Sequence, residues 1–85
     1  MHNYKEAIRN AVKQLTDLGC FVSFGCHDNW VTTLVITPIR PGIGRPDHYR
    51  HSVLKDALMY RKIRDELLGV VGAVKAEEKL AEENS

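Results

Sequence analysis

The sequence predicts an α+β fold, a single small domain whose elements follow the order α-β-β-α. Apolar residues recur with helical spacing near both ends of the chain. Between them lies a stretch rich in aromatic and β-branched residues, with a turn signal at its centre. The chain has 85 residues, which is enough for one hydrophobic core and not for two. We therefore expect residues 1–85 to form one domain.

Residues 3–18 are predicted to form an amphipathic helix. Asn3 can cap its N-terminus, and Gly19 stands where helices commonly end in left-handed backbone. The opposite face is polar, so one side should pack on a core and the other should face water. The apolar residues that recur at three- and four-residue steps are Tyr4, Ala7, Ile8, Ala11, Val12, Leu15 and Leu18.

Residues 20–39 are predicted to form an antiparallel β-hairpin. Asp28 and Asn29 suit a two-residue turn, which sets His27 opposite Trp30. In this register neither face of the hairpin is cleanly polar. Because a lone hairpin is marginal in water, both faces need covering. Packed helices can cover one face, whereas the second face or the open edges need another chain or the C-terminal helix.

Residues 40–51 are predicted to be a connector rich in proline, glycine and basic residues. The prolines around it stop the preceding strand and set the angle at which the next helix begins. An anion site is the alternative, because backbone N–H groups of a glycine-rich loop and the arginines nearby can bind phosphate. The stretch lacks the lysine and hydroxyl residue that complete a phosphate-binding loop. We therefore favour the connector.

Residues 52–83 are predicted to form a long C-terminal helix, capped by Ser52 or by Asp47 upstream. At 1.5 Å per residue it would be ~48 Å long, whereas a compact domain of this size is about 30 Å across. Either the helix breaks at Gly69 or Gly72, or its far end packs on a partner or frays. A short heptad pattern favours a partner, with the seam at Tyr60, Ile63, Leu67, Val70 and Val74.

The order of charges along this helix also favours association. Residues 40–64 carry seven basic and two acidic residues, and residues 65–85 carry two basic and six acidic residues. This order opposes the helix dipole, whereas two antiparallel copies would set basic turns against acidic ones. We therefore predict a small, non-enzymatic binding module that forms a homodimer or binds another protein. The predicted interface residues are Phe21, Trp30, Tyr60, Ile63, Leu67, Val70 and Val74.

Nucleic-acid binding is the alternative prediction. The excess of basic residues between positions 40 and 64 could neutralise a phosphate backbone. The residues that would form this anion-binding surface are Arg40, Arg45, Arg50, His51, Lys55, Arg61 and Arg64.

The remaining chemistry in the sequence is sparse. Cys26 and His51 could act as a thiol and its base, and Cys26 with the histidines could bind zinc. No CxxC pair is present, and nothing in the spacing favours either site. We therefore predict no catalytic residue, no metal and no cofactor.

The same sequence predicts a cytoplasmic protein without a membrane partner. No apolar run approaches the ~20 residues that a membrane-spanning helix needs, and the N-terminal stretch has no apolar signal region. In the cytoplasm Cys20 and Cys26 should be reduced thiols.

Overall fold

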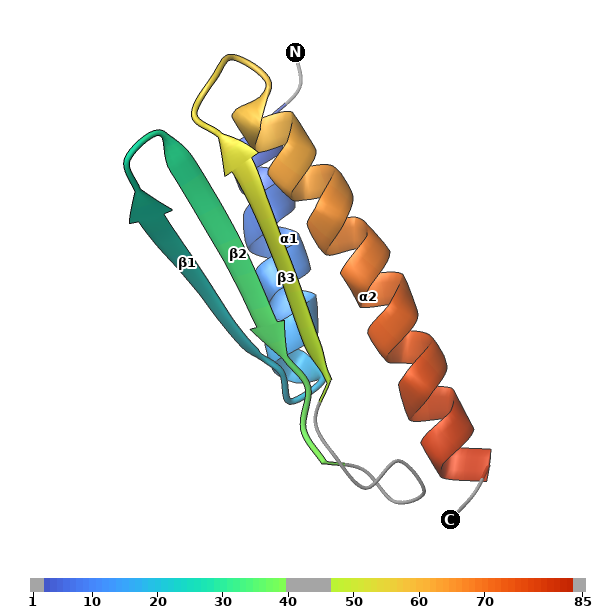
Figure 1. Cartoon of the computed structure of the whole chain (residues 1–85). Coiled ribbons are helices and arrows are strands. Elements are labelled where there is room, and N and C mark those ends of the chain that lie inside the picture. Colours follow the sequence, from blue (N-terminus) through green and yellow to red (C-terminus); the bar gives the residue numbers. More distant parts are fainter. Residues whose placement is uncertain (1–2, 40–46, 84–85) are drawn as a thin grey trace.

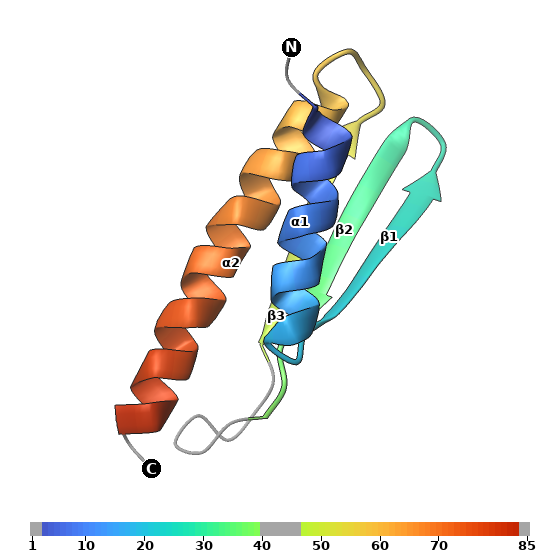
Figure 2. The same ribbon diagram turned by 180° about the vertical axis from the view of Figure 1, so that it is seen from behind.

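The computed structural model describes residues 3–39 and 47–83 and shows two layers. One layer is a three-stranded antiparallel sheet with the strand order β1-β2-β3. Both helices lie on the same side of this sheet and run side by side (Figures 1 and 2). The α+β prediction is confirmed, with one strand more than the sequence predicted. The elements are α1 (Tyr4–Asp17), β1 (Phe21–His27), β2 (Trp30–Ile36), β3 (His48–Leu54) and α2 (Met59–Glu83).

Helix α1 lies within one residue of the predicted range 3–18 at each end, with Asn3 and Leu18 as its caps. The side chain of Asn3 accepts a hydrogen bond from the backbone N–H of Glu6 at 3.1 Å. After the helix, Gly19 has a φ of 84°, and a Cβ at this position would lie 3.3 Å from Cγ of Pro38. Glycine is therefore required here both by the backbone conformation and by the close approach of the proline ring.

The β1–β2 hairpin also has the predicted register. His27 pairs with Trp30 across the turn, and Phe24 pairs with Thr33 further along. Asp28 takes a left-handed φ of 52°, a conformation that Asp tolerates better than most residues. The two-residue turn therefore fixes which side chains share a face of the hairpin.

The third strand corrects the prediction for residues 47–58. β3 occupies the end of the predicted connector and the start of the predicted helix, and it pairs along the whole of β2. Its side chains alternate, but histidine, arginine and serine dilute the apolar signal of that alternation. Val53 and Leu54 fall within the predicted helix because their spacing also fits a helical pattern. The arginines Arg40 and Arg45 of the predicted connector lie outside the described residues.

Helix α2 begins at Met59 and not at residue 52. A turn precedes it, in which the N–H of Leu58 donates to Oδ1 of Asp56 at 2.9 Å. The helix then runs unbroken through Gly69 and Gly72 for 25 residues, or about 37 Å at 1.5 Å per residue. Residues along one side are buried from Ile63 to Ala81, so the chain itself covers the inner side of this helix. The length that suggested a partner is thus accounted for within the chain.

The core lies between the sheet and the two helices. Its largest fully buried side chains come from both helices and the central strand: Leu15 of α1, Val35 of β2, and Leu67 and Val74 of α2. Burying a side chain of this size contributes about 1.5–3 kcal/mol. The molecule is a thin slab of 44 × 29 × 14 Å, because nothing in the described chain lies on the second side of the sheet. Neither described helix is long and apolar enough to span a membrane.

Gly69→Ala and Gly72→Ala should each stabilise the chain. Both glycines are exposed within α2, and a Cβ at either position would meet no atom within 4 Å. We expect a gain of about 0.5–1 kcal/mol in the free energy of unfolding for each substitution, measured by urea denaturation. Gly19→Ala is the matched control and should destabilise, because its φ is positive. A loss of stability at Gly69 or Gly72 would contradict the exposed position of these residues.

Candidate interaction surface

The sheet has a covered face toward the helices and an open face away from them. The open face is unusual for an antiparallel sheet, because large apolar residues are exposed at both of its ends. Phe21 is 61% exposed at one end, and Trp30 is 45% exposed at the other. From β1 to β3, the rows of the open face are Phe21–Ile36–His48, Ser23–Leu34–Arg50, Gly25–Thr32–Ser52 and His27–Trp30–Leu54.

Every phenylalanine and tryptophan of the chain lies on the β1–β2 hairpin. The sequence has two phenylalanines and one tryptophan, namely Phe21, Phe24 and Trp30. All three are exposed, and the core is built from aliphatic residues instead. Since these side chains bury the most apolar area per residue, a chain that leaves all of them in water has much to gain from a partner on the hairpin.

Phe24 is notable because it lies on the covered face. Its partners across the strands are Thr33, which is 3% exposed, and His51 beyond it. Phe24 itself is 46% exposed, and its neighbour Cys26 on the same face is also exposed. The helical layer therefore covers β2 and leaves this corner of β1 open. The sequence did not indicate this, because which strand the helices cover is decided by packing.

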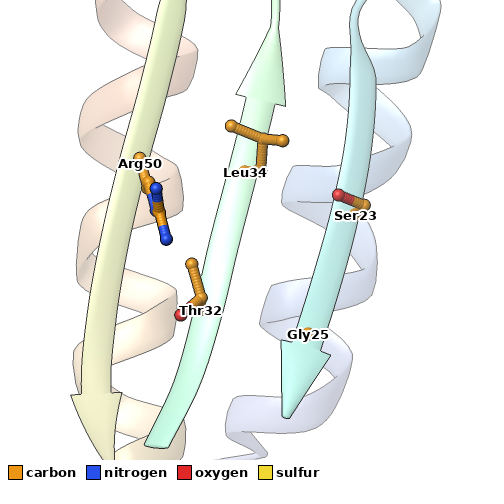
Figure 3. A pocket seen from close by; sticks show the side chains of 5 residues that line it. All are labelled: Ser23, Gly25, Thr32, Leu34 and Arg50. Atoms are coloured by element: carbon orange, nitrogen blue, oxygen red, sulfur yellow. The ribbon is translucent and has the colours of Figure 1, made fainter. Parts of the chain in front are cut away.

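A shallow hollow of about 240 Å³ lies at the centre of the open face (Figure 3). It forms where Gly25 has no side chain, next to Ser23 and Thr32, with Leu34 and Arg50 completing its wall. Arg50 supplies the positive charge of this face, and no carboxylate among residues 3–39 and 47–83 pairs with it. The hydroxyl groups of Thr32 on β2 and Ser52 on β3 form a hydrogen bond at 2.8 Å, which holds these two side chains next to each other.

The predicted interface residues fall into two groups. Four residues of the heptad pattern lie in the core between the helices and the sheet. Phe21 and Trp30 lie on the open face, and Tyr60 is exposed at the start of α2. The heptad spacing thus corresponds to packing within the chain, where the neighbouring helix α1, which runs parallel to α2 (Figure 2), satisfies the same pattern that a partner helix would. The buried residues of the predicted interface are Ile63, Leu67, Val70 and Val74.

The predicted anion-binding residues that the structure describes do not form one surface. Arg50 lies on the open face, whereas His51 lies on the covered face with Nδ1 3.8 Å from Glu66. Arg64 donates to Asp65 at 2.7 Å, and its guanidinium lies 4.7 Å from the centre of the Tyr4 ring.

Lys55 and Arg61 are exposed at the end of the molecule where α2 begins. Lys62 is exposed there too, with Nζ 3.9 Å from Asp56. A basic cluster therefore exists at the N-terminal end of α2, and it is smaller than the predicted one.

The thiol and metal hypotheses find no support in the geometry. Cys26 is on β1 and His51 is on β3, with β2 between them. Two strand spacings amount to about 10 Å, far beyond hydrogen-bond reach. Within the part of the chain that the structure describes, no three His, Cys, Asp or Glu side chains are arranged to hold a metal ion.

A hydrogen bond ties β3 to the C-terminal half of α2. The hydroxyl of Tyr49 donates to Oε1 of Glu77 at 3.0 Å, joining residues 28 positions apart. Burial, this hydrogen bond and the negative charge of Glu77 raise the pKa of Tyr49 to about 12 from its ordinary value of 10.0. The bond lies on the covered side, so it holds the helix against the strand that the sequence did not predict.

The chain was also compared with known proteins. No protein-family model, no curated protein and no solved structure matches it. The function is therefore argued from the surface itself.

The Tyr49–Glu77 hydrogen bond should make stability fall at alkaline pH. Because the folded-state pKa is raised, the stabilisation is fully present below pH 10, where the unfolded phenol is still protonated. It is lost as the pH rises from about 10 through 12, since the unfolded phenol then ionises first. Wild type should exceed Tyr49→Phe by about 1 kcal/mol in urea denaturation at pH 8, and the gap should shrink by pH 11.

Tyr60→Phe is the matched control for this measurement. It removes the hydroxyl of an exposed ring, which lies beneath Lys5 at 5.2 Å, and leaves Tyr49 intact. It should therefore keep the alkaline loss of wild type. A gap between wild type and Tyr49→Phe that stays constant from pH 8 to pH 11 would exclude the role of this bond.

Proposed function

We propose that the protein is a non-enzymatic interaction module that associates with a second copy of itself through the β1–β2 hairpin. The observation that carries this proposal is the exposure of Phe21, Phe24 and Trp30 on one hairpin. Large aromatic side chains supply most of the energy of protein interfaces, and they are costly to leave in water. The module acts by occupying a surface and not by chemistry.

The shape of the molecule supports the same proposal. The accessible surface is 5781 Å², whereas a compact monomer of 9.6 kDa exposes about 5,100 Å². The excess comes with a slab only 14 Å thick, in which none of the residues in 3–39 and 47–83 covers the open face of the sheet. A second chain on the hairpin would reduce this excess.

The hairpin is a better interface than the outer side of α2. Helix α2 exposes Leu68 and Leu80 singly, among charged residues and glycines. Scattered apolar residues of this kind are normal on protein surfaces.

A reducing compartment such as the cytoplasm suits the role, because Cys26 on β1 is exposed and is a free thiol.

Nucleic-acid binding is the second candidate, and the start of α2 favours it. The N-terminal end of a helix carries a partial positive charge, and Arg61, Lys62 and Arg64 lie in the first turns of α2. A phosphate backbone would be attracted by the side chains and the dipole together. The acidic neighbours Asp56 and Asp65 weaken that attraction. We therefore place this function second.

Wild-type protein should be a dimer in solution, and Phe21→Ser should weaken the dimer. Phe21 is exposed, so its replacement leaves the core intact, but it removes a large apolar contact. We expect the dissociation constant to rise at least about tenfold, measured by light scattering over a range of concentrations.

Leu80→Ser is the matched control for Phe21→Ser. Leu80 is 52% exposed on the outer side of α2, and its replacement should leave the dissociation constant unchanged. Wild-type protein that remains monomeric at about 500 µM would exclude the proposed function.

The second candidate makes a different prediction for salt. If the start of α2 binds phosphates, a 30-base-pair RNA or DNA duplex should bind at 50 mM salt and dissociate steeply as salt increases. Arg61→Ala should weaken this binding similarly for every sequence, as measured by fluorescence anisotropy. Lys79→Ala, near the far end of the same helix, is the control. No binding at 50 mM salt would eliminate this candidate.

A further inference from the structure

Strand β1 has a free edge, and the hydrogen bonds of the sheet show which of its residues face outward. Two bonds extend the β2–β3 ladder beyond its ends: Lys55 N–H to the carbonyl of Asn29 at 2.7 Å, and Thr37 N–H to the carbonyl of Asp47 at 3.0 Å. The β2-side partners in both bonds, Asn29 and Thr37, are odd-numbered. The backbone N–H and C=O groups of the odd-numbered residues of β2 therefore point toward β3. The even-numbered residues therefore bond β1, starting from the pair His27–Trp30 beside the turn.

Because bonded and non-bonded pairs alternate, the odd-numbered residues of β1 bond β2. The N–H and C=O groups of Val22, Phe24 and Cys26 consequently point away from the sheet. These groups lie along the free edge of β1, a strand of seven residues that is about 23 Å long.

This edge has none of the features that usually prevent pairing with another strand. Natural edge strands carry lysine, proline, a bulge or an inward-pointing charge. β1 contains no proline and no Asp, Glu, Lys or Arg, and its register with β2 is uninterrupted. The other edge differs, because β3 carries Arg50 with His48 and His51. Two copies of β3 would bring two Arg50 guanidinium groups close together, whereas two copies of β1 would bring together no side chain of Asp, Glu, Lys or Arg.

We propose that two copies of the chain pair antiparallel along β1, with Phe24 facing Phe24 of the other copy, to form one continuous six-stranded sheet. The inference rests on the proposed self-association and specifies its geometry. In this register Val22 faces Cys26 of the other copy. Val22, Phe24 and Cys26 of each copy thus form three backbone hydrogen-bonded pairs with the other copy, with roughly six hydrogen bonds in all.

The length of the overlap selects this register over the others that two-fold symmetry permits. Centring the pair on Phe24 matches all of Phe21–His27 with the same residues of the second copy. Moving the centre of the pairing by one residue places it at Ser23 or Gly25 and leaves residues at one end of β1 without a partner strand. Centring it on Val22 or Cys26 shortens the overlap further. Each lost pair leaves backbone groups without a partner.

The same register gives new neighbours to Phe24, Cys26 and Phe21, which the single chain leaves exposed. On the covered face, the two Phe24 rings lie side by side, and each Cys26 lies beside Val22 of the other copy. On the open face, Phe21 comes next to His27 of the other copy. Aromatic cross-strand pairs contribute roughly 0.2–1 kcal/mol each. A 23 Å edge is at the small end of specific interfaces, so we expect a dissociation constant in the micromolar range.

Disulfide trapping tests the register directly. In a Cys26→Ser background, Phe24→Cys should give a covalent dimer under mild oxidation, because the two Cα atoms would be about 5.5 Å apart. Ser23→Cys in the same background should remain monomeric on a non-reducing gel, since its two Cα atoms would be about 8 Å apart. Val22→Cys with Cys26 retained keeps both Phe24 rings and should also crosslink. Wild type, with Cys26 alone, should not.

The association itself is measured in parallel by light scattering. Phe24→Lys should raise the dissociation constant at least about tenfold, since it places a charge on the edge, and Leu80→Lys should not. A wild-type dimer in which neither Phe24→Cys nor Val22→Cys crosslinks would overturn the β1 pairing and leave the proposed function standing. Wild-type protein that stays monomeric at about 500 µM would overturn both.

Discussion

The packing of both helices on one side of a three-stranded sheet is the constraint on which the rest of this structure depends. The core between them is built around Leu15, Leu67, Val35 and Val74, and it accounts for the length of α2 and for the burial of its heptad positions other than Tyr60. With both helices used on one face, the described chain has nothing left for the other. The exposed aromatic residues, the free edge of β1 and the thin shape all follow from this division.

The covered face of the sheet holds the residues that stabilise the fold, and most of the residues available for association lie outside the core. The buried core consists mainly of aliphatic side chains, whereas Phe21, Phe24 and Trp30 remain exposed on the hairpin. A small domain gains little stability from one core, so a dimer that buries the remaining aromatic residues would add a second source. The proposed β1 pairing does this for Phe24 and gives Phe21 a new neighbour without moving any core residue, which lets the single chain fold before it associates.

The reversed charge order of α2 has an explanation within the chain. The basic residues at its start contact groups from α1 and from the preceding turn: Arg64 lies over the ring of Tyr4, and Lys62 approaches Asp56. Lys5 of α1 lies in turn over Tyr60, which fastens the two helix starts together. Near the other end, the carboxylate of Glu77 accepts a hydrogen bond from Tyr49. These contacts offset the unfavourable dipole, so the charge order is not by itself evidence for a partner helix.

The sequence by itself determined the two helices, the hairpin and its register, because each rests on local chemistry. Asn3 and Gly19 mark the ends of α1, and Asp28 with Asn29 fixes the turn that sets His27 against Trp30. Only the tertiary structure decided that residues 48–54 form a strand. Their own pattern is weak, and it is pairing with β2 that selects the extended conformation.

Tertiary structure alone likewise decided that Ile63, Leu67, Val70 and Val74 of α2 are buried within the chain and that Phe24 is exposed. A periodic apolar pattern specifies that a helix face will be covered, but not which element covers it, because α1 and a second chain satisfy the same spacing.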